Sequence, residues 1–518
     1  EICRRVLRAM GISEEPGELP KIETRLDVTE AVNNCMLVSD RFTCDLPSLV
    51  PALEFASRRR VGSRSLTLLV DRMPDLSADE LRGLMRLYGI DRLIGIGSEY
   101  EDVPGAVVFH NASELMATLS AADFSSELIV VKGEPDSVVH KVAERLRLRH
   151  HETVLEVNLD AVIHNFNHFK AMLRPSTGLV AMVKASGYGA GSYELAKTLQ
   201  SHGAAYLAVA VVDEGEELRR AGITMPIMVL NPKVTNYTSL FANRLEPEVF
   251  SFDMLGEIIR EADKRGISNY PVHIKFDTGM HRLGFLREDI PALGRVLRDT
   301  STVSVRSVFS HLATADCLDQ DDYTLGQLSL FDDICREMTA EIGSGFLRHI
   351  LNSAGIARFP QWQYDLCRLG ISLYGVDTLG IPETSSLKTV SSLRSIIISL
   401  KHWPKGTSIG YARRTVLDHD AVIATVPVGY ADGLNRRLSN GAGSVMVRDH
   451  RCPIVGNICM DACMIDVTSV GGSVAVGESV EFFGNQIAVS EVADVIGTIP
   501  YEVLTSVSPR VKRVYYRE

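Results

Sequence analysis

A lysine stands where an interior strand is predicted to end. Residues 179–183 form an apolar run typical of a buried parallel strand, and Lys184 follows it directly. Glycines then break the pattern before a helix that we expect over residues 193–200. A lysine that is partly desolvated at a strand end can lose its proton and form a Schiff base with a carbonyl compound. The same spacing fits a lysine that caps the strand and extends into solvent, so the pattern alone leaves both interpretations open.

The elements that would position Lys184 alternate regularly between strand and helix. Eight apolar segments between residues 151 and 380 are predicted as strands, with helices between them, for example over 212–221. This alternation predicts a (β/α)8 TIM barrel, in which functional side chains gather at the carboxyl ends of the strands. The predicted strands are 179–183, 206–211, 226–229, 248–250, 272–275, 303–309, 349–351 and 367–370.

Two further regions flank the predicted barrel. Short alternating strands with glycine turns, at 421–428, 444–448 and 479–483, predict a separate β domain over residues 381–518. Five strand candidates before residue 150 alternate with helical stretches, which predicts a small Rossmann-like α/β domain over residues 1–150. We therefore expect an α/β protein: a small α/β domain, a TIM barrel over residues 151–380 and a C-terminal β domain.

The composition limits the classes of function. The 518 residues suffice for two or three domains, and 45% of them are hydrophobic. A formal net charge of −11 argues against a nucleic-acid or anionic-membrane binder. No apolar run reaches the roughly 18 residues that a membrane span requires. The nine cysteines contain no C-x-x-C pair and no common zinc spacing, so we expect free thiols, no metal and a cytoplasmic location.

The segment around Lys184 also matches a known motif. Residues 183–191, Val-Lys-Ala-Ser-Gly-Tyr-Gly-Ala-Gly, closely resemble the segment of the alanine racemase family whose lysine binds pyridoxal 5′-phosphate (PLP). Later motifs return in that family's order, and the resemblance extends from about residue 152 to the end of the chain. It implies a PLP-dependent isomerase that interconverts L-alanine and D-alanine for peptidoglycan synthesis.

The resemblance also implies which residues hold the cofactor. Arg368, two residues before Gly370, would face the pyridine nitrogen. A guanidinium donates a hydrogen bond there without giving up its proton, so the ring nitrogen stays unprotonated and the cofactor is a weaker electron sink. A short-lived carbanion is then reprotonated before transamination competes. The implied phosphate contacts are Tyr188, Ser353, the backbone at Gly370 and Ile371, and Tyr501.

Two proton-transfer groups are implied, because inversion needs an acid or base on each face of the reacting carbon. Lys184 would serve one face, and the resemblance places the second base at Tyr411 in Ser-Ile-Gly-Tyr-Ala-Arg-Arg. It further implies that His311 hydrogen-bonds Tyr411 and that Tyr411 comes from the other subunit. A homodimer with shared active sites follows from the resemblance.

Other matched residues concern the substrate. Segment 275–285 implies that Arg282 pairs with the substrate carboxylate, a geometry that suits a guanidinium. Segment 456–461 implies that the backbone N–H of Met460, beside Asp461, binds the same carboxylate. Lys275 matches a lysine that is often carbamylated in the family, and we treat this modification as a hypothesis. The resemblance also places Asp316, Tyr430 and Arg436 at the entrance to the site.

Part of the first 150 residues resembles the C-terminal domain of a Mur ligase, UDP-N-acetylmuramoyl-tripeptide–D-alanyl-D-alanine ligase. The matching segments are 25–28, 40–49 and 130–133. Such a ligase needs the phosphate-binding loop G-x-x-x-x-G-K-[ST], and the sequence contains no Gly-Lys dipeptide, so no ligase activity is expected of this chain. We expect it to be part of a longer bifunctional ligase and racemase, with ligase domains upstream of Glu1.

Two other functions stay open on the sequence. One is a racemase for a larger amino acid, because the preference for alanine depends on Tyr501 and Tyr411 crowding the pocket. The other is a PLP-binding scaffold whose first domain docks Mur ligase domains.

Overall fold

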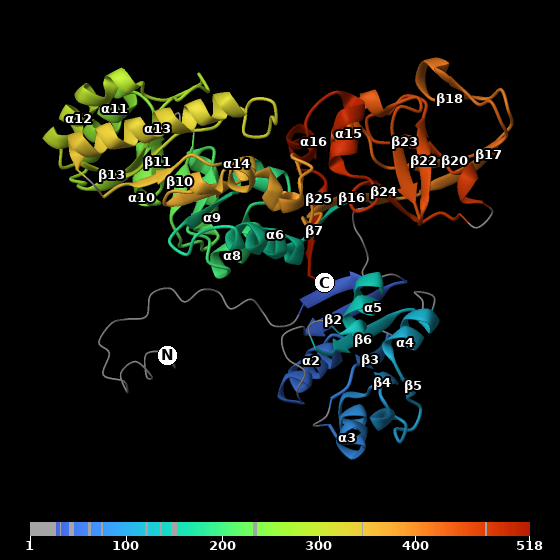
Figure 1. The fold of residues 1–518 in the computed structure, drawn as a ribbon. Helices are drawn as coiled ribbons and strands as arrows, with labels where there is room; N and C mark the ends of the chain where they lie inside the picture. The colour runs from blue at the N-terminus through green and yellow to red at the C-terminus, as the bar shows by residue number, and fades with distance from the viewer. Residues whose placement is uncertain are drawn as a thin grey trace, which may run out of the picture. The chain divides into compact units, whose positions relative to one another are not determined.

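The computed structural model of the chain separates into two compact units, residues 1–150 and 151–518 (Figure 1). The residues that it describes are 27–31, 33–40, 46–60, 64–73, 76–119, 123–134, 137–146, 153–230, 236–343, 345–471 and 474–517. Residues 25–26 and 41–45 of the Mur-like segments lie outside these ranges. Within the ranges, no helix is both long enough and apolar enough to cross a membrane.

A six-stranded sheet forms the centre of the first unit. Its order is β1-β2-β6-β3-β4-β5, with β1 antiparallel to β2 and the other pairs parallel. Neighbouring residues of β3 enter separate hydrophobic clusters, Leu68 one and Leu69 the other, because both faces of a parallel sheet are covered. The elements are β1 (Asp27–Ala31), β2 (Cys35–Asp40), α2 (Leu46–Arg58), β3 (Ser65–Val70), α3 (Ala78–Tyr88), β4 (Arg92–Ile96), β5 (Val107–Phe109), α4 (Ala112–Thr118), β6 (Glu127–Lys132) and α5 (Val138–Leu146).

Eight parallel strands form a barrel in the second unit, in the order β14-β13-β12-β11-β10-β9-β8-β15. Backbone hydrogen bonds from Arg368 N to Leu351 O (3.0 Å) and from Asp365 N to Arg348 O (3.1 Å) join the two end strands and close the barrel. The strands are β8 (Gly178–Met182), β9 (Tyr206–Val209), β10 (Ile227–Val229), β11 (Glu246–Val249), β12 (Tyr270–Lys275), β13 (Val303–Phe309), β14 (Leu347–His349) and β15 (Leu366–Leu369). The predicted TIM barrel is confirmed.

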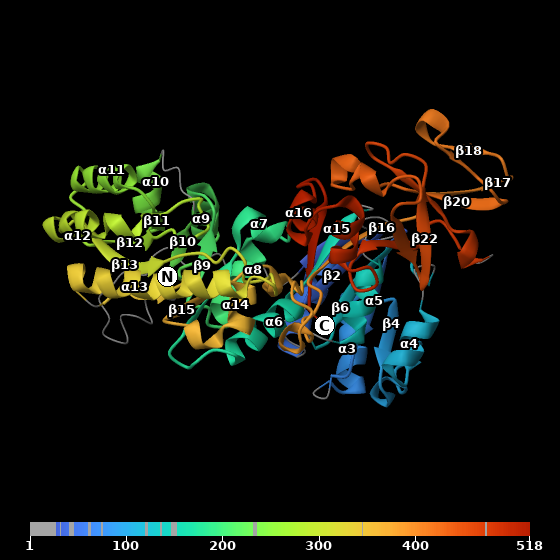
Figure 2. The same ribbon diagram turned by 45° about the horizontal axis from the view of Figure 1, so that its top comes forward.

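Helices cover the outside of the barrel (Figure 2). In α11 the buried residues Met254, Leu255, Ile258 and Ala262 form the apolar stripe expected of a helix packed on a sheet. Asn352 caps α14 through a hydrogen bond from Gly355 N to its Oδ1 (2.9 Å), so that this helix begins at Ser353. The helices are α6 (Leu159–Ala171), α8 (Tyr193–Ser201), α9 (Val212–Arg220), α10 (Tyr237–Ala242), α11 (Phe252–Asp263), α12 (Ile290–Asp299), α13 (Asp321–Ile342) and α14 (Ser353–Arg358).

A nine-stranded, mostly antiparallel sheet forms the β domain, in the order β17-β20-β23-β22-β21-β24-β16-β7-β25. Strand β7 (Val154–Asn158) precedes the barrel in sequence, yet it pairs with β16 and β25 of this sheet. The sheet therefore includes a strand from the range that was predicted for the barrel. The other elements are β16 (Ser391–Ile396), β17 (Ser399–Trp403), β20 (Ala421–Val426), β21 (Ser444–Val447), β22 (His450–Val455), β23 (Cys463–Asp466), β24 (Ser479–Phe483), α15 (Val489–Ile496), α16 (Pro500–Ser506) and β25 (Lys512–Tyr516).

Candidate active site

A cavity opens at the carboxyl ends of the barrel strands. Lys184 follows β8, Arg368 lies in β15, which pairs with β8, and Lys275 ends β12. Functional residues of a TIM barrel are expected at this end. The cavity brings together these residues singled out in the sequence: Lys184, Tyr188, Lys275, Arg282, His311, Asp316, Ser353, Arg368, Gly370, Ile371 and Tyr501.

A left-handed turn directs Lys184 and Tyr188 to the cavity wall. Strand β8 ends at Met182, and the φ angles of Ala185, Ser186 and Tyr188 are 52°, 52° and 51°. Residues with a Cβ avoid this region because the Cβ crowds a carbonyl oxygen. Such strain persists only where the surroundings enforce it, and it is concentrated at functional sites.

The surroundings of this turn come from two elements. Tyr374 donates a hydrogen bond from its hydroxyl to the carbonyl oxygen of Met182 (2.8 Å). Gly189 packs against α16, and a Cβ at this position would lie 2.3 Å from the carbonyl oxygen of Leu504. Arg513 donates from Nε to the carbonyl oxygen of Gly189 (2.9 Å). The turn is therefore held from the barrel and from the β domain together.

The environment of Lys184 favours the neutral amine. Burial, followed by the positive charge of Arg282, lowers the pKa of Lys184 below its usual value, and Glu214 opposes the shift. Among the described residues Lys184 forms no ion pair. A neutral amine can attack a carbonyl carbon and can accept a proton.

A polar recess at one end of the cavity is formed by Tyr188, Ser353, Gly370 and Tyr501. The buried ring of Tyr188 stacks on Tyr374 with centroids 4.6 Å apart, and it lies 5.9 Å from the ring of Tyr501. A Cβ at Gly370 would lie 3.4 Å from the Tyr188 hydroxyl and 3.6 Å from Ser353 Oγ, so the glycine leaves the recess open. The Tyr188 hydroxyl makes no hydrogen bond to any residue that the structure describes. Hydroxyl and backbone N–H groups around an open space suit a phosphate.

Arg368 is buried in the cavity floor and fixed by several acceptors. It donates to the carbonyl oxygens of Ser310 (2.7 Å) and Ile350 (2.9 Å), and its guanidinium lies 5.4 Å from the centre of the Phe309 ring. Burial lowers the pKa of Arg368 to about 10, so the side chain stays cationic at neutral pH. It can present a donor to a ligand without losing its proton.

A chain of hydrogen bonds continues from Arg368 across the barrel interior. Arg368 is 2.6 Å from Nδ1 of His349, whose Nε2 is 3.0 Å from Ser307 Oγ. Ser307 Oγ is 2.6 Å from Nδ1 of His273, and the Nε2 of His273 is 3.0 Å from Glu246. Every polar group in this chain has a partner, which fixes the orientation of the guanidinium.

His311 lies beside Arg368, with its Nδ1 3.3 Å from the guanidinium. Burial, followed by the positive charge of Arg368, lowers the pKa of His311 well below its usual value. The imidazole is therefore neutral at physiological pH and has a nitrogen that can accept a hydrogen bond.

The cavity carries an excess of positive charge. Of the described side chains that line it, four are basic (Lys184, Lys275, Arg282, Arg368) and two are acidic (Glu248, Asp316), so positive charge is in excess even when Lys184 is neutral. Arg282 makes no hydrogen bond or ion pair with a described residue, whereas Lys275 Nζ pairs with Glu248 at 3.2 Å. An anionic ligand with more than one negative group fits this distribution.

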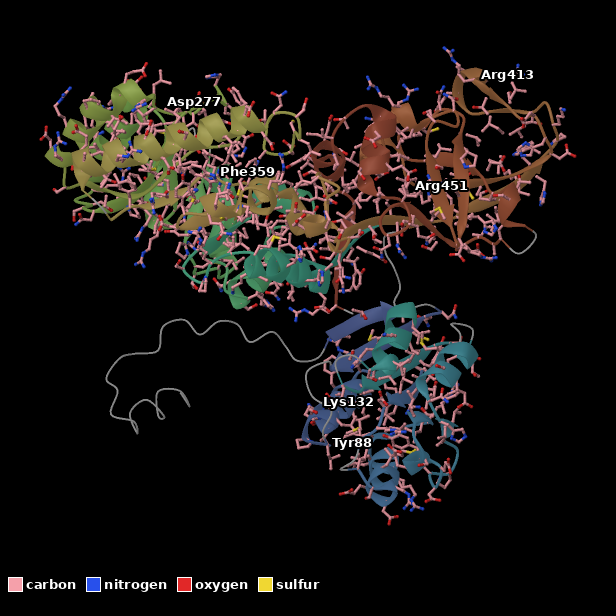
Figure 3. The ribbon with its side chains drawn as sticks, in the orientation of Figure 1. Tyr88, Lys132, Asp277, Phe359, Arg413 and Arg451 are labelled. Carbon is pink, nitrogen blue, oxygen red and sulfur yellow. The ribbon has the colours of Figure 1, made fainter. Side chains whose placement is uncertain are left out.

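Tyr411 does not line this cavity. It is 70% exposed and lies in the short helix η7 (Tyr411–Arg413), directly after β18 (Ser408–Ile409). Arg413 is labelled at the outer end of the β domain, away from the barrel, in Figure 3. One chain therefore does not bring Tyr411 to Lys184, and the contact of Tyr411 with His311 across subunits stays a prediction.

The other predicted residues of the β domain also lie outside the cavity. The side chains of Met460 and Tyr430 are 54% and 44% exposed. Asp461 pairs with Arg510 at 2.7 Å. Arg436 begins the short helix η9 (Arg436–Leu438). These residues would meet a substrate only if a second copy of the β domain faced the cavity.

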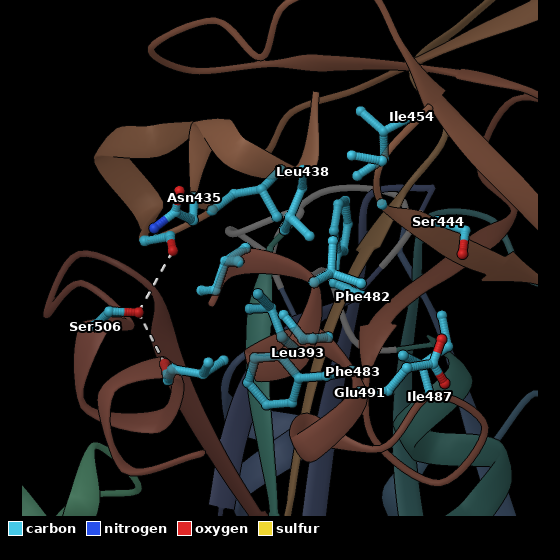
Figure 4. A pocket seen from close by; sticks show the side chains of 18 of the residues that line it. Leu393, Asn435, Leu438, Ser444, Ile454, Phe482, Phe483, Ile487, Glu491 and Ser506 are labelled. Carbon is cyan, nitrogen blue, oxygen red and sulfur yellow. Dashed lines mark hydrogen bonds between the residues drawn. The ribbon is translucent and has the colours of Figure 1, made fainter. Parts of the chain in front are cut away.

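A second cavity lies within the β domain and has a different character (Figure 4). Its walls are mainly apolar, and the polar groups there have partners. Ser506 Oγ donates to the carbonyl oxygen of Val503 (2.8 Å), and Arg451 pairs with Glu491. Arg451 and Glu491 neutralise each other and are the titratable side chains among the described lining residues, so we assign the chemistry to the barrel cavity.

Sequence reasoning missed Glu248 and Tyr374. Glu248 is a buried carboxylate in the cavity wall, and Tyr374 stacks under Tyr188. The available signal for Glu248 was a charged residue at the start of a predicted interior strand, which needs a partner when buried.

Comparison with known proteins covers both the barrel and the β domain. Residues 157–378 match the family description "Alanine racemase, N-terminal domain" and residues 390–515 match "Alanine racemase, C-terminal domain". Alanine racemase 2 of Caldanaerobacter subterraneus subsp. tengcongensis is 38% identical over 380 residues, which are 70% of this chain and 94% of that protein. The alanine racemase of Clostridium novyi is 38% identical over 376 residues, 70% of this chain and 95% of that protein.

Solved structures of alanine racemases are also similar to this chain. The alanine racemase from E. faecalis has a TM-score of 0.65 at 32% identity and covers 71% of this chain and 99% of its own. The alanine racemase from Bartonella henselae, described with covalently bound pyridoxal phosphate, has a TM-score of 0.64 at 27% identity and covers 71% of this chain and 100% of its own. The chain belongs to the alanine racemase family.

Proposed function

We propose that residues 151–518 interconvert L-alanine and D-alanine, with PLP held covalently on Lys184. The observation that carries the proposal is one cavity, in a member of the alanine racemase family, that combines Lys184, the polar recess and Arg368. The excess of cationic side chains supports the same ligands, because PLP carries a phosphate and alanine a carboxylate.

The residues present fit the cofactor. Tyr188, Ser353, Tyr501 and the N–H groups of Gly370 and Ile371 would hold the phosphate, and Arg368 would donate to the pyridine nitrogen. When bound, PLP supplies an electron sink that acidifies the α-hydrogen of the amino acid. Arg368 keeps its own proton, which limits that sink and favours rapid return of the α-proton over side reactions.

Lys184 and Tyr411 exchange the proton on opposite faces. Lys184 accepts or returns it on one face, because its lowered pKa makes the neutral amine accessible. Tyr411 of the partner subunit serves the other face, and neutral His311, whose Nδ1 accepts from Arg368, donates a hydrogen bond from Nε2 to the Tyr411 hydroxyl. The support for a homodimer is a highly exposed tyrosine on the β domain and a cavity with a base on one side only.

Arg282 and residues of the partner subunit hold the substrate. Arg282 is a cation in the cavity wall without a partner among the described residues, so it binds the substrate carboxylate at little desolvation cost. The N–H of Met460 of the partner subunit, beside Asp461 of the partner subunit, lies at the same carboxylate. Asp316 of the same chain also lines the cavity.

The proposal also covers the cellular setting and the first domain. D-alanine made here feeds peptidoglycan synthesis, and the cytoplasm is the proposed location, since every cysteine that the structure describes is a free thiol. Residues 1–150 are proposed as a Mur ligase C-terminal domain attached to further ligase domains upstream. A mostly parallel α/β sheet and the Mur-like segments support this assignment.

Racemisation of purified protein tests the function. Each L-amino acid is offered to PLP-loaded protein, and optical rotation is followed with time. We expect alanine to be converted fastest, and faster conversion of serine or lysine would overturn the substrate assignment. A different result would favour a PLP-binding scaffold. In that case the parent protein would show a PLP absorbance band that is lost in Lys184→Ala, but it would racemise no amino acid.

A further inference from the structure

Glu248 is a buried carboxylate in the cavity wall to which the proposed function gives no task. It lies in β11, is 1% exposed, and its two carboxylate oxygens are 3.2 Å and 3.3 Å from Lys275 Nζ. Lys275 ends β12 and is 6% exposed. A buried ammonium and a buried carboxylate at this distance depend on each other, because removal of either leaves an uncompensated charge.

The surrounding charges show how strongly Lys275 depends on this partner. Burial lowers the pKa of Lys275, and among the neighbouring charges Glu248 opposes the shift most strongly. Arg282 and Arg368 act in the opposite direction, since both are cations. Glu248 is therefore the neighbouring group that most favours the protonated form of Lys275.

Carbamylation of Lys275 would need the other protonation state. A neutral lysine nitrogen attacks the carbon of carbon dioxide, forms an N–C bond and releases one proton, and the product is a carbamate anion. At Lys275 this reaction would exchange a cation for an anion directly beside the Glu248 carboxylate. Two buried negative groups would then face each other, which burial penalises.

We propose that Glu248 supplies the negative charge of this wall from the polypeptide itself and that Lys275 stays an unmodified ammonium. Glu248 is then a positioning residue: it neutralises Lys275 and leaves Arg282 as the cation that binds the substrate carboxylate. The role of Arg282 in this inference rests on the proposed function. This proposal is the alternative to the carbamylated Lys275 that the family resemblance implies.

Carbon-13 NMR of the PLP-loaded protein, equilibrated with labelled bicarbonate, tests the state of Lys275. We expect no carbamate signal, and the same racemisation rate before and after removal of carbon dioxide. A carbamate signal that is lost in Lys275→Met overturns the proposal. The proposed function would fail if the parent protein did not racemise alanine. The NMR signal does not depend on turnover, so it tests the state of Lys275 separately from that outcome.

Glu248→Gln tests the positioning role, because it keeps the shape and removes the charge. We expect the KM for alanine to rise about tenfold or more with a smaller change in kcat, as for a lost binding interaction. Labelled bicarbonate should partly restore KM and give a carbamate signal that Glu248→Gln/Lys275→Met lacks. The proposal is contradicted if Glu248→Gln has the same KM and kcat as the parent protein and shows no carbamate signal.

Glu246→Gln is the matched control. Glu246 is also a buried carboxylate of β11, but it hydrogen-bonds His273 (3.0 Å) and Tyr206 (3.2 Å) instead of Lys275. We expect no effect of bicarbonate on the KM of this variant. The same bicarbonate rescue in Glu246→Gln would contradict a specific role of Glu248.

Discussion

The hydroxyl of Tyr188 provides a sharp test of the phosphate-binding recess. It has no hydrogen-bond partner among the described residues, although the ring is buried. In Tyr188→Phe the ring and its stacking on Tyr374 remain, and the loss is one hydroxyl directed into the recess. The variant should therefore lose cofactor affinity and keep its folding stability.

The magnitude follows from the type of interaction. A hydrogen bond to a charged group contributes about 1.5–3 kcal/mol. At about 1.36 kcal/mol per factor of ten, the dissociation constant of PLP should rise roughly 10- to 160-fold. The free energy of unfolding of the protein without PLP should change by less than about 0.5 kcal/mol, because no bond within the chain is broken.

Affinity is best measured in the Lys184→Ala background, where PLP binds without a covalent bond and titration by fluorescence reaches equilibrium. Tyr374→Phe is the matched control, since its hydroxyl donates to the carbonyl oxygen of Met182 at 2.8 Å. That change should lower the free energy of unfolding by about 1–3 kcal/mol, because a buried acceptor is left unpaired. Parental PLP affinity in Tyr188→Phe, or an equal loss of stability in both variants, would refute the assignment of the recess.

Four further predictions concern the remaining residues. Lys184→Ala should slow racemisation by at least about 1,000-fold, because the covalent attachment and one proton-transfer group are both lost; chiral chromatography measures the two enantiomers. The rate at which PLP attaches to protein freed of cofactor should rise with pH and reach half its maximum below pH 10.5, since burial and Arg282 lower the pKa of Lys184; a midpoint at or above 10.5 speaks against this environment. Arg282→Met should raise the KM for alanine by about tenfold or more, and an unchanged KM would remove Arg282 from the substrate site. Co-expression of Lys184→Ala with Tyr411→Phe should restore about a quarter of parental activity, since half of randomly paired dimers contain one intact shared site; no recovery would argue against sharing.

The alternation of strand and helix in the barrel could be predicted because several of its strands, such as β8 and β9, form continuous, largely buried apolar runs. The predicted and observed ends of the eight strands differ by two residues or fewer. The position of β7 in the sheet of the β domain could not be predicted from the sequence. Its pairing with β16 joins residues that are far apart in sequence, such as Val157 and Ser391. Strand β1 was not predicted, because its sequence, Asp-Val-Thr-Glu-Ala, is largely polar and the strand lies at the edge of the sheet.

The sequence predicted which residues form the candidate site better than it predicted how they contact one another. Motif resemblance located the lysine and most of the side chains that line the cavity, but spacing does not report ion pairs. The partner of Lys275 is on the preceding strand, and only the parallel pairing of β11 with β12 brings Glu248 to it. The left-handed turn after Lys184 could not be predicted from the sequence either, because Ala185 and Ser186 have no intrinsic preference for positive φ.

The central claim is that PLP attaches to the half-buried Lys184 and not to Lys275, the buried lysine of the cavity. Lys275 also has a lowered pKa, but Glu248 holds it as an ammonium, whereas Lys184 forms no ion pair with a described residue. Borohydride reduction of the PLP-loaded protein, followed by peptide mass spectrometry, fixes the cofactor on the lysine that carries it. The account predicts the pyridoxyl group on Lys184, and a pyridoxyl group on Lys275, or on neither lysine, would contradict it.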